Sequence, residues 1–272
     1  MDEVRISVAG VCVALRINDA EVAERTRARY REFLAPDTTP DFVIDVAVHG
    51  REEVSPLMPR ILEVTTSFHD DILTFESSFG EGKADFDAGY GMLSAAHLPM
   101  VRLLIENYLR ILYAWYMVRI GGVLLHSAGV VKDKRAYLFF GPSGSGKSTI
   151  TRLSMEHVVL SDDILIVRPV NGSFQVFGVP FRGELVYAPR ANTRAPLVGI
   201  FRLRKAKEHR VELLSPARAL AELVSCAPFV ITDAAMAQRV MKICVELVRQ
   251  VPVKELHFRK DSGFWRVIDA QS

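Results

Sequence analysis

The residues whose types and spacing are best suited to chemistry form one short stretch, residues 141–148. They fit the phosphate-loop pattern G-x-x-x-x-G-K-[ST] at every fixed position. In such a loop, backbone N–H groups surround the phosphates of a nucleotide, and glycines allow the close approach and positive φ angles that this requires. Lys147 is expected to reach the β- and γ-phosphates, and the Ser148 hydroxyl to ligate Mg²⁺. The sequence therefore predicts a site for ATP and Mg²⁺ formed by Gly141, Pro142, Ser143, Gly144, Ser145, Gly146, Lys147, Ser148 and Thr149.

Two adjacent carboxylates follow this loop. Asp162 and Asp163 come directly after a short apolar run, residues 158–160, so we expect them on the sheet edge that also carries Lys147 and Ser148. One of them can hold Mg²⁺, and the other can accept a proton from an attacking hydroxyl group. Their proximity raises the affinity of one of the two for a proton. The alternative is a solvated acidic turn, which is common after a strand.

His126 is a third candidate, because it lies in the apolar run 123–131 just before the strand that leads into the loop. A single histidine among apolar residues is often a hydrogen-bonded core residue rather than a functional one. The residues alone leave both alternatives open.

The segments beside the loop have the order that phosphate binding needs. Residues 135–140 form an aromatic-rich apolar run that predicts a buried strand, and residues 147–155 are compatible with a helix. This order sets the free N–H groups and the positive dipole end of the helix against the phosphates. A chance glycine-serine linker is disfavoured, because it would not be flanked so closely by a strand and a helix.

Composition places few limits on function beyond a globular fold. The 272 residues are 49% hydrophobic and 24% charged, which suits one or two domains, and the net charge of +2 predicts no nucleic-acid partner. The three cysteines lie far apart without metal-type spacing, and the chain begins with acidic residues instead of an apolar signal segment. We therefore expect a cytoplasmic protein with free thiols.

Residues 98–120 imitate a membrane span by their apolar composition. Arg102, Glu106 and Arg110 recur at every fourth position, however, and charges at the middle of a span are costly. We expect a long helix packed on the core, with one charged edge in water and no membrane partner.

The chain divides by pattern into an N-terminal part, residues 1–97, and a C-terminal part, residues 98–272. The first is predicted to be a mainly antiparallel β module with a helix over 22–34 and strands over 4–8, 11–15, 42–48, 61–68, 72–77, 83–87 and 92–95, broken by turns that include residues 80–82. The second is predicted to contain a long helix from about residue 100, a bent strand or strand pair over 123–131, and further strands over 164–167, 173–176 and 253–258. Ser215 and Thr232 are the expected N-caps of two late helices, the second of which runs to Gln250.

Residues 125–129 (LHSAG), the phosphate loop and residues 160–163 (LSDD), in this order, resemble the catalytic domain of the HPr kinase/phosphorylase family, and more distantly ATP-dependent phosphoenolpyruvate carboxykinase. The resemblance covers about residues 120–190 and implies an α/β fold (α+β for the whole chain) with a P-loop kinase domain of that type. It implies that Lys147 and Ser148 contact phosphate and Mg²⁺. It also implies that Asp163 is the proton acceptor in phosphorylation and the donor in the reverse reaction, with Asp162 beside it on the metal side, and that His126 belongs to the active site.

The chain also departs from this family. The family has an acidic residue that helps to hold Mg²⁺ just before an Arg-Gly pair; Arg182 and Gly183 are similar to that pair, but Phe181 occupies the acidic position. Glu184 is the expected substitute as a metal ligand. The basic glycine-rich loop with which the family engages HPr is not evident, and the N-terminal part differs from that of bacterial HPr kinases. The chain is more similar to divergent HPr-kinase-like proteins of peptide natural-product clusters, or to those that phosphorylate small molecules such as free serine.

Together these features predict an ATP-dependent kinase that transfers the γ-phosphoryl group to a hydroxyl group of a protein, a peptide or a serine-like small molecule. Asp163, Lys147 and His126 are the expected catalytic residues, and Ser148, Asp162 and Glu184 the expected metal ligands. One alternative is a nucleotide-binding regulatory or scaffold protein without turnover, which Phe181 favours. Another is a shikimate-kinase-like enzyme, although the loop of such enzymes lies near the start of the chain.

Two further expectations concern arginines and assembly. One arginine is expected to stabilise the transferred phosphoryl group, although each single one is more readily explained as part of a solvated surface. A homo-oligomer is expected by analogy with HPr kinases. The candidate arginines are Arg182, Arg190, Arg194, Arg202 and Arg204.

Overall fold

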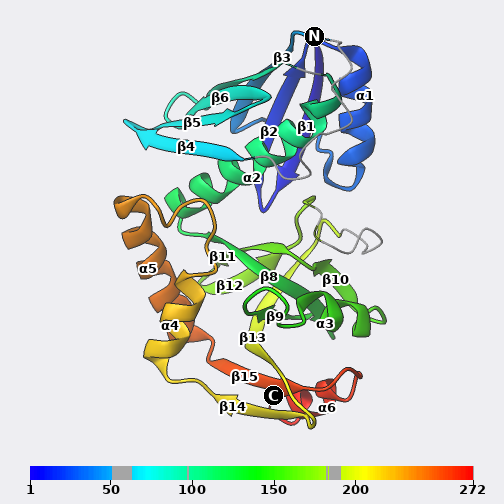
Figure 1. Cartoon of the computed structure of the whole chain (residues 1–272), viewed down its shortest axis with the longest axis vertical. Coiled ribbons are helices and arrows are strands. Elements are labelled where there is room, and N and C mark those ends of the chain that lie inside the picture. Colours follow the sequence, from blue (N-terminus) through cyan, green and yellow to red (C-terminus); the bar gives the residue numbers. More distant parts are fainter. Residues whose placement is uncertain (51–62, 97, 182, 184–190, 272) are drawn as a thin grey trace. The chain divides into compact units, whose positions relative to one another are not determined.

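Figure 1 shows a computed structural model of the chain, which describes residues 1–50, 63–96, 98–181, 183 and 191–271. The chain forms two compact units, residues 1–116 and residues 117–272. Each has its own sheet system and is described by itself. None of the helices in the described ranges is long and apolar enough to cross a membrane.

Unit 1 is built on a seven-stranded sheet in the order β1-β2-β3-β7-β6-β5-β4. Its helices are α1 (Ala20–Arg29) and α2 (Val101–Arg119), and short 3₁₀ turns cover Arg31–Phe33 and Leu98–Met100. The strands are β1 (Asp2–Val8), β2 (Val11–Ile17), β3 (Phe42–Val48), β4 (Val64–His69), β5 (Ile72–Ser77), β6 (Gly80–Asp85) and β7 (Tyr90–Ala95).

The sheet of unit 1 is mixed. Four neighbouring pairs are antiparallel, as predicted for most of this part, but β3 runs parallel to both of its neighbours, β2 and β7. The turn expected at residues 80–82 is wrong, because these residues are paired within β6. Glycine is needed there for packing rather than for a turn: a Cβ atom at Gly82 would lie 2.9 Å from the Tyr108 ring.

Helix α2 packs on the sheet of unit 1 through its aromatic residues. The Tyr108 hydroxyl donates a hydrogen bond to the Lys83 carbonyl (2.7 Å), and the Trp115 ring stacks on Phe68 with ring centroids 4.5 Å apart. The expected charged edge in water is only partly present, because Glu106 is buried and pairs with both Arg110 and Arg29 of α1. These contacts explain why the chain divides near the end of α2, whereas the pattern placed the division before it, at residues 97 and 98.

Unit 2 contains the glycine-rich loop. Its helices are α3 (Lys147–Leu153), α4 (Pro216–Val224), α5 (Ala234–Gln250) and α6 (Phe264–Asp269). Its strands are β8 (Val123–Lys132), β9 (Arg135–Phe140), β10 (Val158–Ser161), β11 (Ile164–Val170), β12 (Ser173–Phe177), β13 (Arg194–Lys205), β14 (Arg210–Leu213) and β15 (Val253–Phe258).

The long strands β8 and β13 organise this unit. The first half of β8 pairs with β11 and its second half with β9 and β10, so residues 123–132 form one continuous strand and not a pair. Strand β13 pairs with β12 at its start and runs parallel between β9 and β15 further on. The parallel strands β9, β13 and β15 therefore end at the same edge of the sheet. Strand β10 ends at this edge as well, because β9 and β10 both run antiparallel to β8.

The late helices begin close to the predicted positions. Ser215 is the N-cap of α4, although its side chain makes no capping hydrogen bond, and Pro216 opens the helix. The predicted cap of α5 is wrong by one residue, because the Asp233 carboxylate, not Thr232, accepts from the Met236 N–H (2.8 Å). A carboxylate at this place also faces the positive end of the helix dipole.

Candidate functional site

The glycine-rich loop connects β9 to α3, in the strand-loop-helix order that the sequence predicts. Gly141, Gly144 and Gly146 all have positive φ angles (151°, 76° and 113°), which other residues adopt only with strain. Gly146 has a second reason to lack a side chain, since a Cβ atom would lie 2.6 Å from the ring of Phe258. Phe258 belongs to a hydrophobic core cluster of unit 2, so the packing of its ring against Gly146 helps to fix the path of the loop.

Lys147 is the first residue of α3 and is buried. Its Nζ donates a hydrogen bond to the Gly141 carbonyl at the other end of the loop (3.0 Å). This contact bridges the two ends of the loop and keeps the ammonium group inside it.

The aspartate pair follows β10 at the same edge of the sheet. Ser161 shapes this turn, because its hydroxyl accepts hydrogen bonds from the N–H groups of Asp163 (3.2 Å) and Ile164 (3.3 Å). Asp162 is 5% exposed. Asp163 is more open and pairs through Oδ1 with Nε2 of His126 (3.1 Å).

His126 is not a core histidine. Although β8 is largely buried, the side chain of His126 is 50% exposed, and its ring reaches Asp163. Its backbone N–H donates to the Cys226 carbonyl (2.7 Å), which fixes the strand at this point.

Gly183 lies directly against the aspartate pair. A Cβ atom at this position would come within 2.6 Å of Oδ1 of Asp162 and 2.5 Å of Cβ of Asp163, so glycine is required for the close approach. Phe181 is buried in the core and does not take the place of an acidic ligand. Arg182, Arg190 and Glu184 lie outside the described residues.

These groups share one cavity of about 470 Å³, here called the loop cavity. It brings together the loop, the aspartate pair and His126, which the sequence predicted as one site. It also contains two cations that sequence reasoning did not place there, Arg152 of α3 and Lys205 at the end of β13. The lining residues are His126, Ser143, Gly144, Gly146, Lys147, Ser148, Thr149, Arg152, Asp162, Asp163 and Lys205.

A second cavity of about 370 Å³ adjoins the first residues of the loop, Gly141–Ser143, and shares His126 with the loop cavity. Its other walls include Arg202 of β13, Glu222 of α4 and Cys226. Nε of Arg202 lies 2.7 Å from Oε1 of Glu222. Burial raises the pKa of the Cys226 thiol, and nearby Lys147 acts in the opposite direction.

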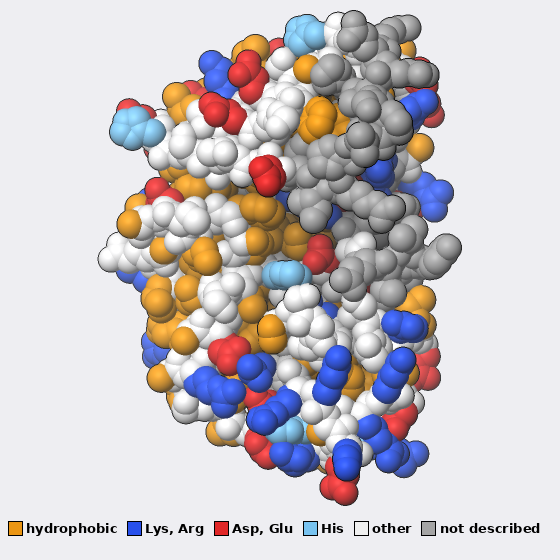
Figure 2. Space-filling view, in the orientation of Figure 1, with side chains coloured by type: hydrophobic (Ala, Val, Ile, Leu, Met, Phe, Trp, Pro, Cys, Tyr) orange, Lys and Arg blue, Asp and Glu red, His pale blue; other side chains and the backbone are white. Residues whose placement is uncertain are grey.

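The structure separates the described candidate arginines. Arg202 reaches the loop through the second cavity, whereas Arg194 lies over the ring of Phe177 and Arg204 pairs with Glu255 on β15. Figure 2 shows Lys and Arg side chains gathered on the face over the region where Figure 1 draws β14 and β15.

Sequence reasoning missed Lys205 and left the role of Arg202 undecided, because β13 was not predicted. Its sequence interrupts an apolar run with a proline, a glycine and several arginines, so no strand was assigned to it. The parallel pairing with β9 is what carries its last residues to the loop, and ligands of open α/β sheets bind at such strand ends.

The fold and the cavity define a mixed α/β protein with two sheet systems, in which a glycine-rich loop joins a strand to a helix. A model of the family described as "SynChlorMet cassette protein ScmC" matches residues 94–271, more than half of the chain. The chain belongs to the ScmC family.

Other comparisons add little to this assignment. No curated protein matches the chain. The "Structure of the Hpr(Ser) kinase/phosphatase from Coxiella burnetii" is similar over 54% of this chain and 95% of that chain, at 12% identity and a TM-score of 0.30. A likeness of this size carries no argument, so a relationship to HPr kinases stays a prediction from the motifs.

Proposed function

We propose that this protein is a Mg-ATP-dependent kinase that transfers the γ-phosphoryl group to a hydroxyl group. The observation that carries the proposal is the shared cavity: it holds the lysine and serine of the loop together with a carboxylate that is paired with a histidine. A loop that only binds nucleotide does not need the last two groups. A kinase needs a proton acceptor close to the transferred phosphate.

In this proposal the loop holds the nucleotide through its backbone N–H groups. Lys147 exchanges its contact with the Gly141 carbonyl for the β- and γ-phosphates. Arg152 and Lys205, which line the same cavity, add positive charge where the phosphates lie.

The oxygen groups of the cavity suit Mg²⁺, which prefers hydroxyl, carboxylate and water oxygens. Ser148 and Asp162 are the described residues that would hold it, since both line the cavity and both lie beside the loop. The bound ion would neutralise charge on the transferred phosphate. Glu184 remains a proposed third ligand.

Asp163 is the proposed proton acceptor. Its Oδ2 is the oxygen left for an acceptor hydroxyl when Oδ1 faces Nε2 of His126. His126 would orient the carboxylate through this contact. The acceptor is a protein, a peptide or a serine-like small molecule.

One observation favours a second function, a nucleotide-binding regulatory or scaffold protein without turnover. Phe181, which stands where HPr kinases have an acidic residue, is buried and cannot serve as a metal ligand. A kinase of this kind would have to complete its metal site differently.

A transfer assay separates the two functions. The purified protein is incubated with γ-labelled ATP, Mg²⁺ and size-fractionated lysate of the source cell, with Lys147→Ala as the control. Label on a macromolecule or a metabolite that depends on Lys147 supports the kinase and gives the size class of the acceptor. ATP binding without transfer in any fraction would support the regulatory protein instead.

A further inference from the structure

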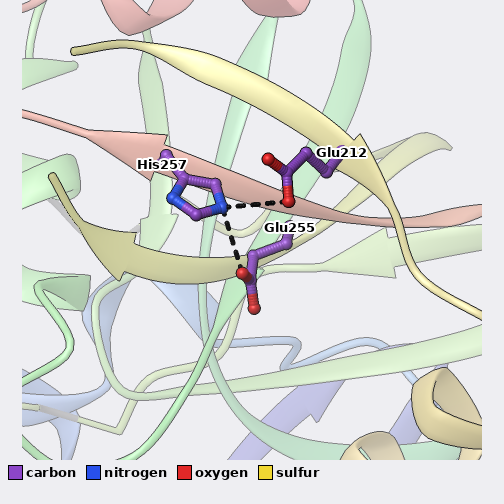
Figure 3. A group of neighbouring side chains, drawn as sticks. All are labelled: Glu212, Glu255 and His257. Carbon is purple, nitrogen blue, oxygen red and sulfur yellow. Dashed lines mark ion pairs between the residues drawn. The ribbon is translucent and has the colours of Figure 1, made fainter.

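A second group of titratable side chains lies away from the loop cavity, on one face of the strands β13, β15 and β14. The register places Arg202, Glu255 and Glu212 opposite one another in one row. The next row on the same face holds Arg204, His257 and Arg210. Figure 3 shows that Glu212, Glu255 and His257 point toward one another from neighbouring strands.

His257 is the unusual member of this group. Its side chain is 3% exposed, yet its Nε2 makes no hydrogen bond among the described residues. Oε1 of Glu255 lies 3.0 Å from Nε2 and Oε2 of Glu212 lies 3.4 Å from it, but neither oxygen stands in hydrogen-bond geometry. Both contacts are ion pairs, and the same arrangement of one ring nitrogen between two carboxylate oxygens is also the one in which these groups ligate a metal ion.

We propose that Glu212, Glu255 and His257 form a binding site for a divalent transition metal of the Zn²⁺ type. Ligand atoms in a tetrahedral zinc site lie about 2.0–2.2 Å from the ion and therefore about 3.3–3.6 Å from one another. The distances from Nε2 to the two oxygens are close to this spacing, and all three ligand atoms lie within 4.8 Å of one another. Three protein ligands leave a fourth position for water, on the side where Glu212 is exposed.

The neighbouring arginines bind mainly the outer oxygens of the two carboxylates. Oε2 of Glu255 contacts Arg202 (2.8 Å) and Arg218 (3.4 Å), and Oε1 of Glu212 contacts Arg210 (2.7 Å). Arg204 alone approaches an inner oxygen, Oε1 of Glu255, at 3.3 Å. Such contacts orient ligating carboxylates from behind and hold their free oxygens toward His257.

The same arginines decide which metal fits. Four guanidinium groups lie around the carboxylates Glu212, Glu222 and Glu255, so the site offers little net negative charge. A hard cation such as Mg²⁺ or Ca²⁺, which is held by charge, is disfavoured. A metal that bonds strongly to an imidazole nitrogen is favoured, which points to Zn²⁺, with Co²⁺ as its spectroscopic substitute.

None of the three proposed ligands lines the loop cavity or the second cavity. Strand β14 has four residues and pairs with β15 at the edge of the sheet, and a metal would join the two strands through Glu212. We therefore expect a structural ion that stabilises unit 2 whether or not the protein is a kinase.

The test uses the full chain without a histidine tag, freed of metal with a chelator. Zn²⁺ binding is measured by calorimetry and by metal analysis after dialysis, and the thermal unfolding temperature is measured with and without Zn²⁺. We expect one Zn²⁺ per chain, a higher unfolding temperature in its presence, and no binding of Mg²⁺ at these residues. The Co²⁺ form should show visible bands of nitrogen and oxygen ligands without a thiolate band.

Two variants and one control locate the ion. Glu212→Gln changes an exposed side chain and should fold normally while its zinc affinity falls at least about tenfold; His257→Asn should abolish binding. His209→Asn, which alters a histidine paired with Asp261 instead, should bind zinc like the unchanged chain. Failure of the chain to bind zinc, equal affinity in Glu212→Gln, or a thiolate band with Co²⁺ would each overturn the proposal.

Discussion

At the scale of single residues, the pair of Asp163 and His126 is the feature that distinguishes the two proposed functions. The two side chains come from different strands and meet at 3.1 Å beside the loop. Because the turn at Ser161 and the approach of Gly183 both fix the position of the carboxylate, its removal can be tested without large rearrangement.

Asp163→Asn should lower the rate of phosphoryl transfer by at least about a hundredfold, since a positioned general base contributes about 10²–10⁴-fold. ATP affinity should stay nearly unchanged, because the amide removes the proton acceptor and leaves the loop intact. The measurement is single-turnover transfer together with nucleotide binding.

A matched control is Asp133→Asn, on a surface turn of the same unit with a positive φ angle (51°) that asparagine tolerates. It should leave the rate of phosphoryl transfer and the affinity for ATP unchanged. Undiminished transfer by a folded Asp163→Asn protein would remove Asp163 from the role of base.

The three cysteines should differ in reactivity. Burial raises the pKa of Cys12, and raises that of Cys244 to about 12, whereas Cys226 is half-buried and lines the second cavity. Because the thiolate is the reactive form and the pKa of Cys226 is also raised, its alkylation should be slow near neutral pH and accelerate as the pH increases.

Mass-spectrometric mapping of alkylated peptides checks this order. Cys226 should react first, and Mg-ATP should slow its reaction by occupying the neighbouring loop. Modification of Cys244 at the same rate as Cys226 would contradict the buried position of Cys244 in α5.

At the scale of elements, the contact between α2 and the sheet of unit 1 depends on two glycines and one tyrosine. Gly82 and Gly91 leave room for Tyr108, whose hydroxyl group reaches the Lys83 carbonyl. The burial of this phenol also raises its pKa far above the ordinary value, so it stays a donor throughout the physiological range.

Tyr108→Phe should lower the free energy of unfolding by about 0.5–1.5 kcal/mol, because it removes the hydrogen bond that the buried phenol donates to the Lys83 carbonyl. The control is Tyr90→Phe. The Tyr90 hydroxyl donates to Asp45 (2.6 Å) at an exposed position, so a smaller loss is expected. Denaturant unfolding of both variants gives the comparison, and equal losses would show that burial of the bond does not matter.

Elements also set the limit of what the sequence could predict. The loop, the strand before it and the aspartate pair carry local signals, and the structure brings them together with His126 as expected. The positions of Arg202, Lys205 and the group around His257 depend on β13 and on its register with β15. This pairing joins residues far apart in the sequence, so no local pattern predicts it. The cap of α5 was missed by one residue because Thr232 and Asp233 are both good caps, and only the backbone path selects between them.

At the scale of the whole molecule, the chain consists of two units, and α2 belongs by its contacts to the first. The sequence pattern assigned this helix to the second part, because the short-strand pattern of the first part ends at about residue 95. Its apolar face instead covers the sheet of unit 1, which would otherwise expose large apolar side chains.

A fragment of residues 1–119 should therefore fold alone, whereas a fragment of residues 1–97 should not, because it lacks the helix that buries Phe75 and its neighbours. Amide dispersion in NMR spectra and cooperative thermal unfolding distinguish the two. A well-dispersed spectrum from residues 1–97 would show that the sheet is stable without α2.

Strand β8 has hydrogen-bonded neighbours on both sides over residues 129–131, and its buried first half pairs with β11 up to His126. Opening of this strand requires several others to separate, so its amide protons should be among the last in unit 2 to exchange with deuterated solvent. The amide of His126 lies outside residues 129–131 and donates to the Cys226 carbonyl, so it should exchange without separation of these strands, and the ring on the same residue is half exposed. One strand thus combines amide protons that should exchange only on global unfolding with a histidine side chain that is open to solvent.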